Sequence, residues 1–401
     1  MVTARFSSAT VFLVLIVGTA LSALPDLGYP GWQCDASLYQ KSKKVPTSAH
    51  SVRFADIKVI GALGDSLTAA NGAGAPKGDP LAVILQYRGL AFQCGGDNTL
   101  DEHVTVASKT NPVLYRFLFI ISSDVLKKFS PNLMGYSTGI GSANVWEVSK
   151  LNQAVPGAEA SDIITQARAL VQIIQSHKEV NWIDYKNDWK LVNVFIGAND
   201  MCAYCNDGEN GGHSKANWKQ NVITAIQILK NNLPRTIVSM TGMFDMRMLR
   251  EIDHDKYFCD GLHTFECPCE KNKAFTNDDI SAACHRYMDA QLEIQSSGIF
   301  DSTDDFTFVV QPFFNGIVTP PLKPDGDVNL DWFAPDCFHF SKLGHANVAK
   351  HLWNNIVQPV GSKNTIVNLS DPTIPLNCPD ASCPFFRTTK NSVDCSKYMT
   401  A

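Results

Sequence analysis

Short apolar runs rich in β-branched residues alternate with longer helical patterns along most of this chain. The clearest runs end in or next to Gly, Asn or Pro, and they occupy residues 57–65, 190–200, 236–243 and 306–313. Runs that are hydrophobic almost throughout are typical of strands buried on both faces of a parallel sheet. The helical patterns place apolar residues every three or four positions over 161–177, 218–234 and 341–357. This alternation predicts an α/β fold, a three-layer α/β/α sandwich with a central parallel sheet.

The first run leads directly into a serine, Ser66, within the stretch GALGDSLTAANGAG (residues 61–74). Open α/β sheets bind ligands beyond the carboxyl ends of their strands, so this side chain is expected to face the ligand crevice. The stretch differs from the G-x-S-x-G turn that carries the nucleophile in many serine hydrolases. Two interpretations therefore stay open on this stretch alone. Ser66 is a nucleophile, or it caps a helix by binding backbone N–H groups.

A nucleophilic serine needs a base, a group that orients the base, and donors for the oxyanion. Asp336 stands three residues before His339 in the segment that precedes the last helical pattern, so its carboxylate can accept a hydrogen bond from the imidazole. Asn199 follows the strongest predicted strand and Gly157 follows a further expected strand, and both can offer N–H groups to the crevice. The alternatives are an Asx-type turn for Asp336, a cap for Asn199 and an ordinary turn for Gly157.

These residues together resemble the signature blocks of a known family. The blocks of the GDSL (SGNH) hydrolases are matched in that family's order between residues 61 and 345, by Gly64-Asp65-Ser66-Leu67, Gly157, Gly197-x-Asn199-Asp200 and Asp336-x-x-His339. Within the family, the stretches LGDSLTAANGAGA, YRGLAFQCGGD, MGYSTG and LNQAVPGA resemble secreted or membrane-anchored phospholipase B. The resemblance implies neither a cofactor nor a metal.

The resemblance also implies a role for each matched residue. Ser66 is expected to be the nucleophile, His339 the base and Asp336 the group that orients it. The oxyanion hole is expected to consist of the backbone N–H groups of Ser66 and Gly157 and the side chain of Asn199.

The activity that the resemblance implies is hydrolysis of acyl esters in phospholipids and lysophospholipids through an acyl-enzyme, with transient contact to lipid surfaces. Two alternatives stay open, a carbohydrate O-acetyl esterase and a lipid-binding module whose triad is silent. Four aromatic residues are candidates either for an acyl channel or for the core, namely Phe92, Phe313, Phe314 and Phe338. A formal net charge of −5 without a long basic run argues against nucleic acid as a partner, and the oligomeric state stays open.

The start of the chain and its cysteines predict an exported protein. Residues 1–23 combine Arg5, an apolar run and small residues, which is typical of a cleaved signal peptide and predicts secretion. Twelve cysteines fit that compartment and predict disulfides of undetermined connectivity. We expect a static bridge rather than redox chemistry at Cys202-Ala-Tyr-Cys205, and a disulfide at Cys337. Asn368 begins the one glycosylation sequon.

The expected domain organisation is one hydrolase domain over residues 24–377, with an insertion at about 245–300 and a Cys-containing tail over 378–401. His345 and His351 are expected at the surface, because their spacing does not align them as metal ligands on one helix face. Asp253-His254-Asp255 is expected to be a solvated loop, which is the usual environment of such residues.

Overall fold

The computed structural model describes residues 27–107, 125–176, 181–254 and 256–399, so the expected signal peptide lies outside the described residues. Within them, parallel strands form one sheet in the order β1 (Ile57–Gly64), β2 (Trp189–Phe195), β3 (Thr236–Thr241) and β4 (Phe306–Gln311). Each strand overlaps one predicted run, and all strand residues except Lys58 are buried. Gly64 pairs with Phe195 and Met240 with Val310, so the carboxyl ends of the strands lie level at one edge.

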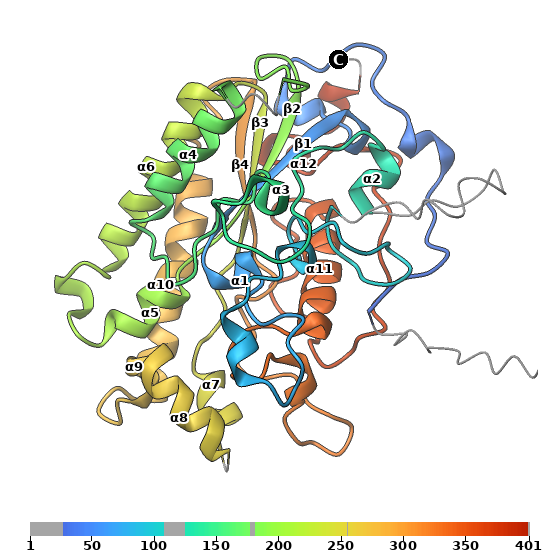
Figure 1. Cartoon of the computed structure of the whole chain (residues 1–401). Helices are drawn as coiled ribbons and strands as arrows, with labels where there is room; N and C mark the ends of the chain where they lie inside the picture. Colours follow the sequence, from blue (N-terminus) through green and yellow to red (C-terminus); the bar gives the residue numbers. More distant parts are fainter. Residues whose placement is uncertain (1–26, 108–124, 177–180, 255, 400–401) are drawn as a thin grey trace, which may run out of the picture.

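Helices cover both faces of the sheet (Figure 1). One face carries α4 (Ile163–Ser176), α6 (Lys215–Asn232) and α10 (Asn277–Ser296), and the other carries α11 (Lys342–Val357). The three predicted helical patterns agree with α4, α6 and α11 to within three residues at each end. The α/β/α sandwich expected from the alternating pattern is therefore confirmed.

The outer edge of β1 differs from expectation. Instead of the further strand expected before Gly157, the described residues contain only isolated parallel bridges, between Val59 and Met134 and between Ala62 and Asn152. A segment without regular secondary structure can lie against this edge because side chains form hydrogen bonds with its backbone. The buried guanidinium of Arg88, for example, donates to the carbonyls of Asn152 and Ala154 at 2.9 and 2.6 Å.

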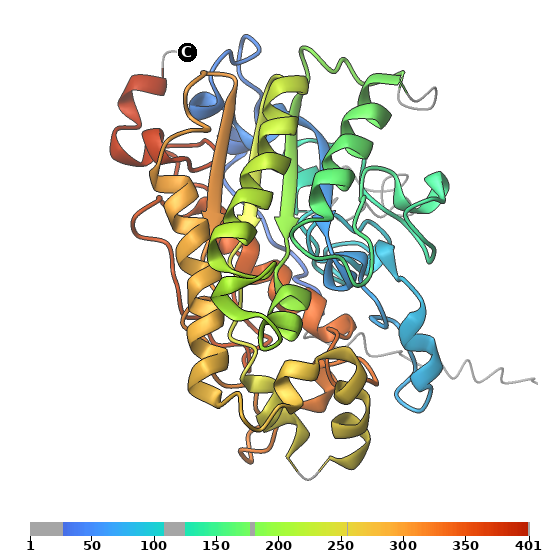
Figure 2. The same ribbon diagram turned by 90° about the vertical axis from the view of Figure 1, so that its left-hand side faces the viewer.

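Shorter helices connect these elements. Their bounds are α1 (Ser66–Ala69), α2 (Val125–Phe129), α3 (Trp146–Ser149), α5 (Ala198–Tyr204), α7 (Met248–Asp253), α8 (Tyr257–Glu266), α9 (Pro268–Lys271), α12 (Thr389–Val393) and the 3₁₀ helix η4 (Pro80–Ile84). The segment of α7, α8 and α9 belongs to the expected insertion and lies beyond the carboxyl ends of the strands (Figure 2).

Helix α11 is buried on all sides, which corrects the expectation for two histidines. His345 and His351 were expected at the surface but are only 0% and 5% exposed. His345 is buried because its ring packs against Phe92, whose backbone N–H donates to His345 Nδ1 at 3.3 Å. His351 is buried because a later segment runs along the outer side of α11, where Asn347 donates to the carbonyl of Leu369 at 3.2 Å and Trp353 donates to that of Asn377 at 2.8 Å. The polar residues of α11 therefore bind backbone rather than water.

The candidate channel aromatics all lie in the hydrophobic core, with exposures of 0% for Phe92, 0% for Phe313, 1% for Phe314 and 6% for Phe338. The ring of Phe92 packs against that of Phe195, with centroids 5.9 Å apart. Of the two alternatives weighed for these residues, core packing is the one that the structure shows.

Ten cysteines form disulfides, Cys34–Cys378, Cys202–Cys267, Cys205–Cys269, Cys259–Cys337 and Cys383–Cys395. The bond of Cys337 was predicted and is confirmed. The expected bridge within Cys202-Ala-Tyr-Cys205 is wrong. Residues three apart on a helix face the same neighbour, and both of these bond to cysteines at the start of α9. Cys94 and Cys284 are buried free thiols, so not every cysteine is bonded.

Candidate active site

Ser66 is the first residue of α1, directly beyond the carboxyl end of β1. The cap of this helix is Asp65, whose Oδ1 accepts a hydrogen bond from the backbone N–H of Leu67 at 2.9 Å. The alternative that Ser66 caps the helix is therefore wrong, and its hydroxyl is not used for capping. Gly64 must be glycine, because a Cβ there would lie 2.4 Å from the carbonyl oxygen of Phe195.

Asp336 and His339 form a hydrogen-bonded pair. Asp336 Oδ2 lies 2.5 Å from His339 Nδ1, and its Oδ1 accepts the backbone N–H groups of Phe338 and His339 at 3.1 and 3.0 Å. The Asx-type turn and the orienting role, weighed as alternatives in the sequence, thus coexist in one carboxylate. The other ring nitrogen, His339 Nε2, is buried and makes no hydrogen bond within the described residues. That atom is the one available to exchange a proton with a hydroxyl.

The electrostatics of the pair favour a basic imidazole. Burial acts to lower the pKa of His339, but the charge of Asp336 and the hydrogen bond to it outweigh burial, and the net pKa is raised. Burial likewise acts to raise the pKa of Asp336, and the imidazole opposes it so that the net pKa is lowered. The negative charge therefore stays on Asp336, where it stabilises an imidazolium.

The loops that carry Ser66 and His339 are packed together. A Cβ on Gly72, six residues after the serine, would lie 2.9 Å from the Cβ of Ala334. Ala334 N–H donates to the carbonyl of His339 at 2.7 Å, which closes the second loop on itself. The charges of Asp65 and His339 also act on each other's pKa, as expected for groups that lie close together.

Besides Ser66, the residues expected to form the oxyanion hole come from two joined segments. Asn199, in α5, donates from Nδ2 to the carbonyl of Ala158 at 2.9 Å, and Asp200 accepts the backbone N–H of Ala160 at 3.0 Å. The segment after Gly157 is thus held against α5. Gly157 has φ of +78°, a conformation that glycine adopts without strain.

The expected alternative role of Asn199 as a helix cap does not apply. The cap of α5 is Gly197, and the helix has no side-chain cap. Because an amide NH₂ carries two donors, the bond to Ala158 leaves Asn199 one N–H for a ligand. Burial raises the pKa of Asp200 to about 7, against the hydrogen bond from Ala160.

Sequence reasoning missed Glu266, a residue of α8. One oxygen of its carboxylate and single donor atoms of Asp336 and His339 all lie within 4.8 Å of one another. Glu266 Oε2 is buried without a hydrogen-bond partner. Burial, followed by the charge of Asp336, raises the pKa of Glu266 to about 7. Nothing near Glu266 in the sequence marks it, because the insertion carries no motif of its own.

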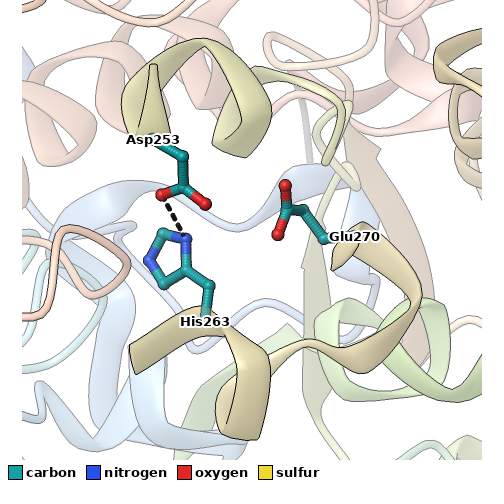
Figure 3. Close-up of side chains that lie close together, drawn as sticks. All are labelled: Asp253, His263 and Glu270. Atoms are coloured by element: carbon teal, nitrogen blue, oxygen red, sulfur yellow. Dashed lines mark ion pairs between the residues drawn. The ribbon is translucent and has the colours of Figure 1, made fainter. Parts of the chain in front are cut away.

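A second aspartate–histidine pair supports the first. His263 Nε2 lies 3.0 Å from the main-chain oxygen of Asp336, and His263 Nδ1 forms an ion pair with Asp253 Oδ1 at 2.8 Å (Figure 3). Both neighbours are acceptors, an arrangement that favours the protonated form of the ring. Burial acts to lower the pKa of His263, but the hydrogen bond and charge of Asp253 outweigh it and raise the pKa.

Asp253, His263 and Glu270 point toward a common centre from α7, α8 and α9 (Figure 3). Their donor atoms suit a divalent cation by type, lying within 4.8 Å of one another. However, the ammonium of Lys271 already forms ion pairs with Asp253 and, at 3.1 Å, with Glu270. The chain therefore neutralises this cluster itself. Asp253 is only 8% exposed, which corrects its expected place in a solvated loop, while Asp255 lies outside the described residues.

None of the helices in the described part of the chain combines the length and the hydrophobicity that crossing a bilayer requires.

A parallel α/β/α sandwich with a serine beyond its first strand and a buried Asp–His pair beside that loop is the architecture of a serine hydrolase. The chain belongs to the GDSL-like lipase/acylhydrolase family, whose model matches residues 60–352. The family resemblance seen in the sequence is therefore confirmed.

The chain is also similar to the membrane-associated phospholipase B1 of three mammals. The Rattus norvegicus protein is 38% identical over 356 residues, which cover 88% of this chain and 23% of the relative. The Mus musculus protein is 39% identical over 88% of this chain and 22% of the relative, and the Homo sapiens protein is 35% identical over 86% and 22%. The chain thus spans less than a quarter of the length of these relatives.

Proposed function

We propose that this protein hydrolyses the acyl ester bonds of phospholipids and lysophospholipids. The observation that carries the proposal is the buried Asp336–His339 pair, whose Nε2 has no partner among the described residues and which is packed against the loop of Ser66. The family and the names of the relatives support lipids as the substrate class.

The proposed reaction has two steps. Ser66 Oγ attacks the ester carbonyl while His339 Nε2 takes the hydroxyl proton, and the same proton then passes to the leaving alcohol. Water attacks the acyl-enzyme with His339 again as base, which releases a fatty acid and restores Ser66. The negative charge on the carbonyl oxygen is stabilised by the backbone N–H groups of Ser66 and Gly157 and by the Asn199 amide.

The five disulfides support the proposal that this chemistry takes place outside the cell, because oxidising compartments preserve such bonds. The substrate then reaches the enzyme from a lipid surface, with transient contact to that surface.

The deciding experiment measures release of fatty acid from phosphatidylcholine and lysophosphatidylcholine in the presence of a chelator, beside acetylated xylan. We expect turnover of both phospholipids and none by Ser66→Ala. Turnover confined to acetyl esters would replace the proposal with a carbohydrate esterase. A protein that binds lipid without labelling by a fluorophosphonate would be a silent lipid-binding module.

A further inference from the structure

Helix α8 turns one face toward the candidate catalytic loop. Cys259, His263 and Glu266 follow one another at intervals of four and three residues, so they lie on one side of the helix. Cys259 is bonded to Cys337, and His263 contacts the main chain of Asp336. The helix is therefore fixed to the loop of the Asp336–His339 pair.

The other side of α8 places aromatic side chains in water. Tyr257, Phe258 and Phe265 are 92%, 54% and 86% exposed. They are the only exposed large aromatic side chains in the described part of the chain. Soluble proteins rarely expose a group of apolar side chains that serves no contact, so this face is suited to an apolar partner.

A second apolar projection follows the loop of Ser66. In η4, Leu81 and Ile84 are 78% and 74% exposed. Residues three apart lie on the same side of a 3₁₀ helix, so these two side chains form one apolar ridge. Helix α8 and η4 (light blue) both lie beyond the carboxyl ends of the strands, the end of the molecule to which Ser66 belongs (Figures 1 and 2).

Basic residues border the aromatic face. Beside Tyr257 lies a hollow of about 520 Å³, to whose lining Lys256 and Lys273 belong. Three acidic residues also line it, and all three form ion pairs with Lys271, namely Asp253, Asp260 and Glu270. Both lysines are exposed. Aromatic rings with a basic flank match the headgroup region of a phospholipid surface, where rings lie at the boundary and lysines meet phosphates.

We propose that the exposed faces of α8 and η4 dock this protein on a phospholipid surface, with Tyr257, Phe258 and Phe265 entering the headgroup layer. The proposal rests on the proposed function for the choice of lipid over a protein partner. It places the end of the molecule that carries Ser66 against the surface that holds the substrate.

Docking is tested by binding to phosphatidylcholine vesicles, measured by co-sedimentation in a Ser66→Ala background so that no lipid is consumed. The test variant carries Tyr257→Ser, Phe258→Ser and Phe265→Ser, and a second carries Leu81→Ser and Ile84→Ser. The matched control is Val393→Ser, because Val393 is 88% exposed on α12 at the opposite end of the molecule (Figure 1). Circular dichroism verifies that each variant is folded.

We expect the α8 variant to lose binding roughly ten- to a hundredfold, the η4 variant to lose less, and Val393→Ser to bind normally. In vesicles that also contain phosphatidylglycerol, Lys256→Ser and Lys273→Ser should each lower binding about fivefold at low salt. With Ser66 intact, the ratio of turnover on vesicles to turnover on dispersed short-chain phosphatidylcholine should fall about tenfold in the α8 variant.

Normal vesicle binding by the folded α8 variant would overturn the proposal. So would a wild-type dimer that the α8 substitutions convert to monomers, since the face would then bind a second copy. The two proposals fail separately. If vesicle binding depends on α8 but no lipid is hydrolysed, the docking proposal stands and the proposed function is wrong. If lipid is hydrolysed but vesicle binding does not depend on α8, the proposed function stands and the docking proposal is wrong.

Discussion

At the scale of single residues, Ser66 is the group on which the proposed chemistry depends. Replacement by alanine removes the attacking oxygen but leaves the cap of α1 in place, because that cap is Asp65. We therefore expect Ser66→Ala to lower turnover roughly 10⁴- to 10⁶-fold with an unchanged thermal transition. Turnover of a soluble ester and circular dichroism test this together. A folded variant with near-normal turnover would remove Ser66 as the nucleophile.

Asn199 is expected to act on the transition state and on the fold at once. Asn199→Ala should lower kcat roughly 10²- to 10³-fold with little change in KM, since it removes an oxyanion donor. It should also lower the free energy of unfolding by about 1 kcal/mol through the lost bond to Ala158. The control is Asn232→Ala, because Asn232 is an exposed residue at the end of α6 whose amide donates to the carbonyl of Ile228. A stability loss alone in both variants would leave Asn199 a purely structural residue.

Glu266 gives a prediction about pH. Its carboxylate is among the charges that raise the pKa of His339, after Asp336. Glu266→Gln removes the charge that this carboxylate carries above its pKa of about 7, so the pKa of His339 should fall and the rise of kcat/KM with pH should move to lower pH. The base must be unprotonated to act, which fixes this sign. The control is Glu293→Gln, because Glu293 is an exposed residue of α10 that forms an ion pair with Lys215 of α6. An unchanged pH profile would contradict the prediction.

At the scale of elements, the Cys259–Cys337 bond joins α8 to the loop of the Asp–His pair across 78 residues of sequence. Replacing both cysteines by serine should lower the free energy of unfolding by about 2–5 kcal/mol and also lower kcat. Replacing Cys383 and Cys395, which are 12 residues apart in the C-terminal segment, should affect stability without affecting kcat. Equal kcat in the two double variants would show that α8 does not position the loop.

The strands follow from the sequence because a strand that is buried on both faces of the sheet has an almost continuous run of apolar residues, which an exposed strand lacks. The four strands were predictable on this ground, and the helices α4, α6 and α11 were predictable from apolar residues at every third or fourth position. The conformation of the segment before Gly157 was not predictable, because side chains such as Arg88 take the place of the hydrogen bonds between strands there.

The residues of the candidate site also divide into those that the sequence marks and those that it does not. Ser66, Asn199 and His339 stand in short motifs at the ends of elements, and these motifs carry the resemblance to the family that marks the three residues. Glu266 and His263 reach the site only through the packing of α8 against the loop of Asp336, for which the sequence offers no local signal besides Cys259.

At the scale of the whole molecule, the two ends of the described chain close around the core. Cys34 is bonded to Cys378, and Phe386 N–H donates to the carbonyl of Val52 at 2.9 Å. The segment from Leu369 to Asn377 runs along the outer side of α11 and buries residues that the sequence alone places in water. His351 is one of them.

The burial of His351 makes stability depend on pH in a defined direction. Desolvation lowers its pKa to about 4 from an ordinary 6.5, so the unfolded chain binds a proton that the folded chain excludes. Its contribution is complete above pH 6.5 and is lost as pH falls toward 4. His351→Gln cannot titrate, so its stability deficit relative to wild type should shrink by about 2 kcal/mol between pH 7 and pH 5. Urea unfolding of both proteins at the two pH values measures this difference. A deficit that stays constant would mean that the pKa of His351 is the same in the folded and the unfolded protein.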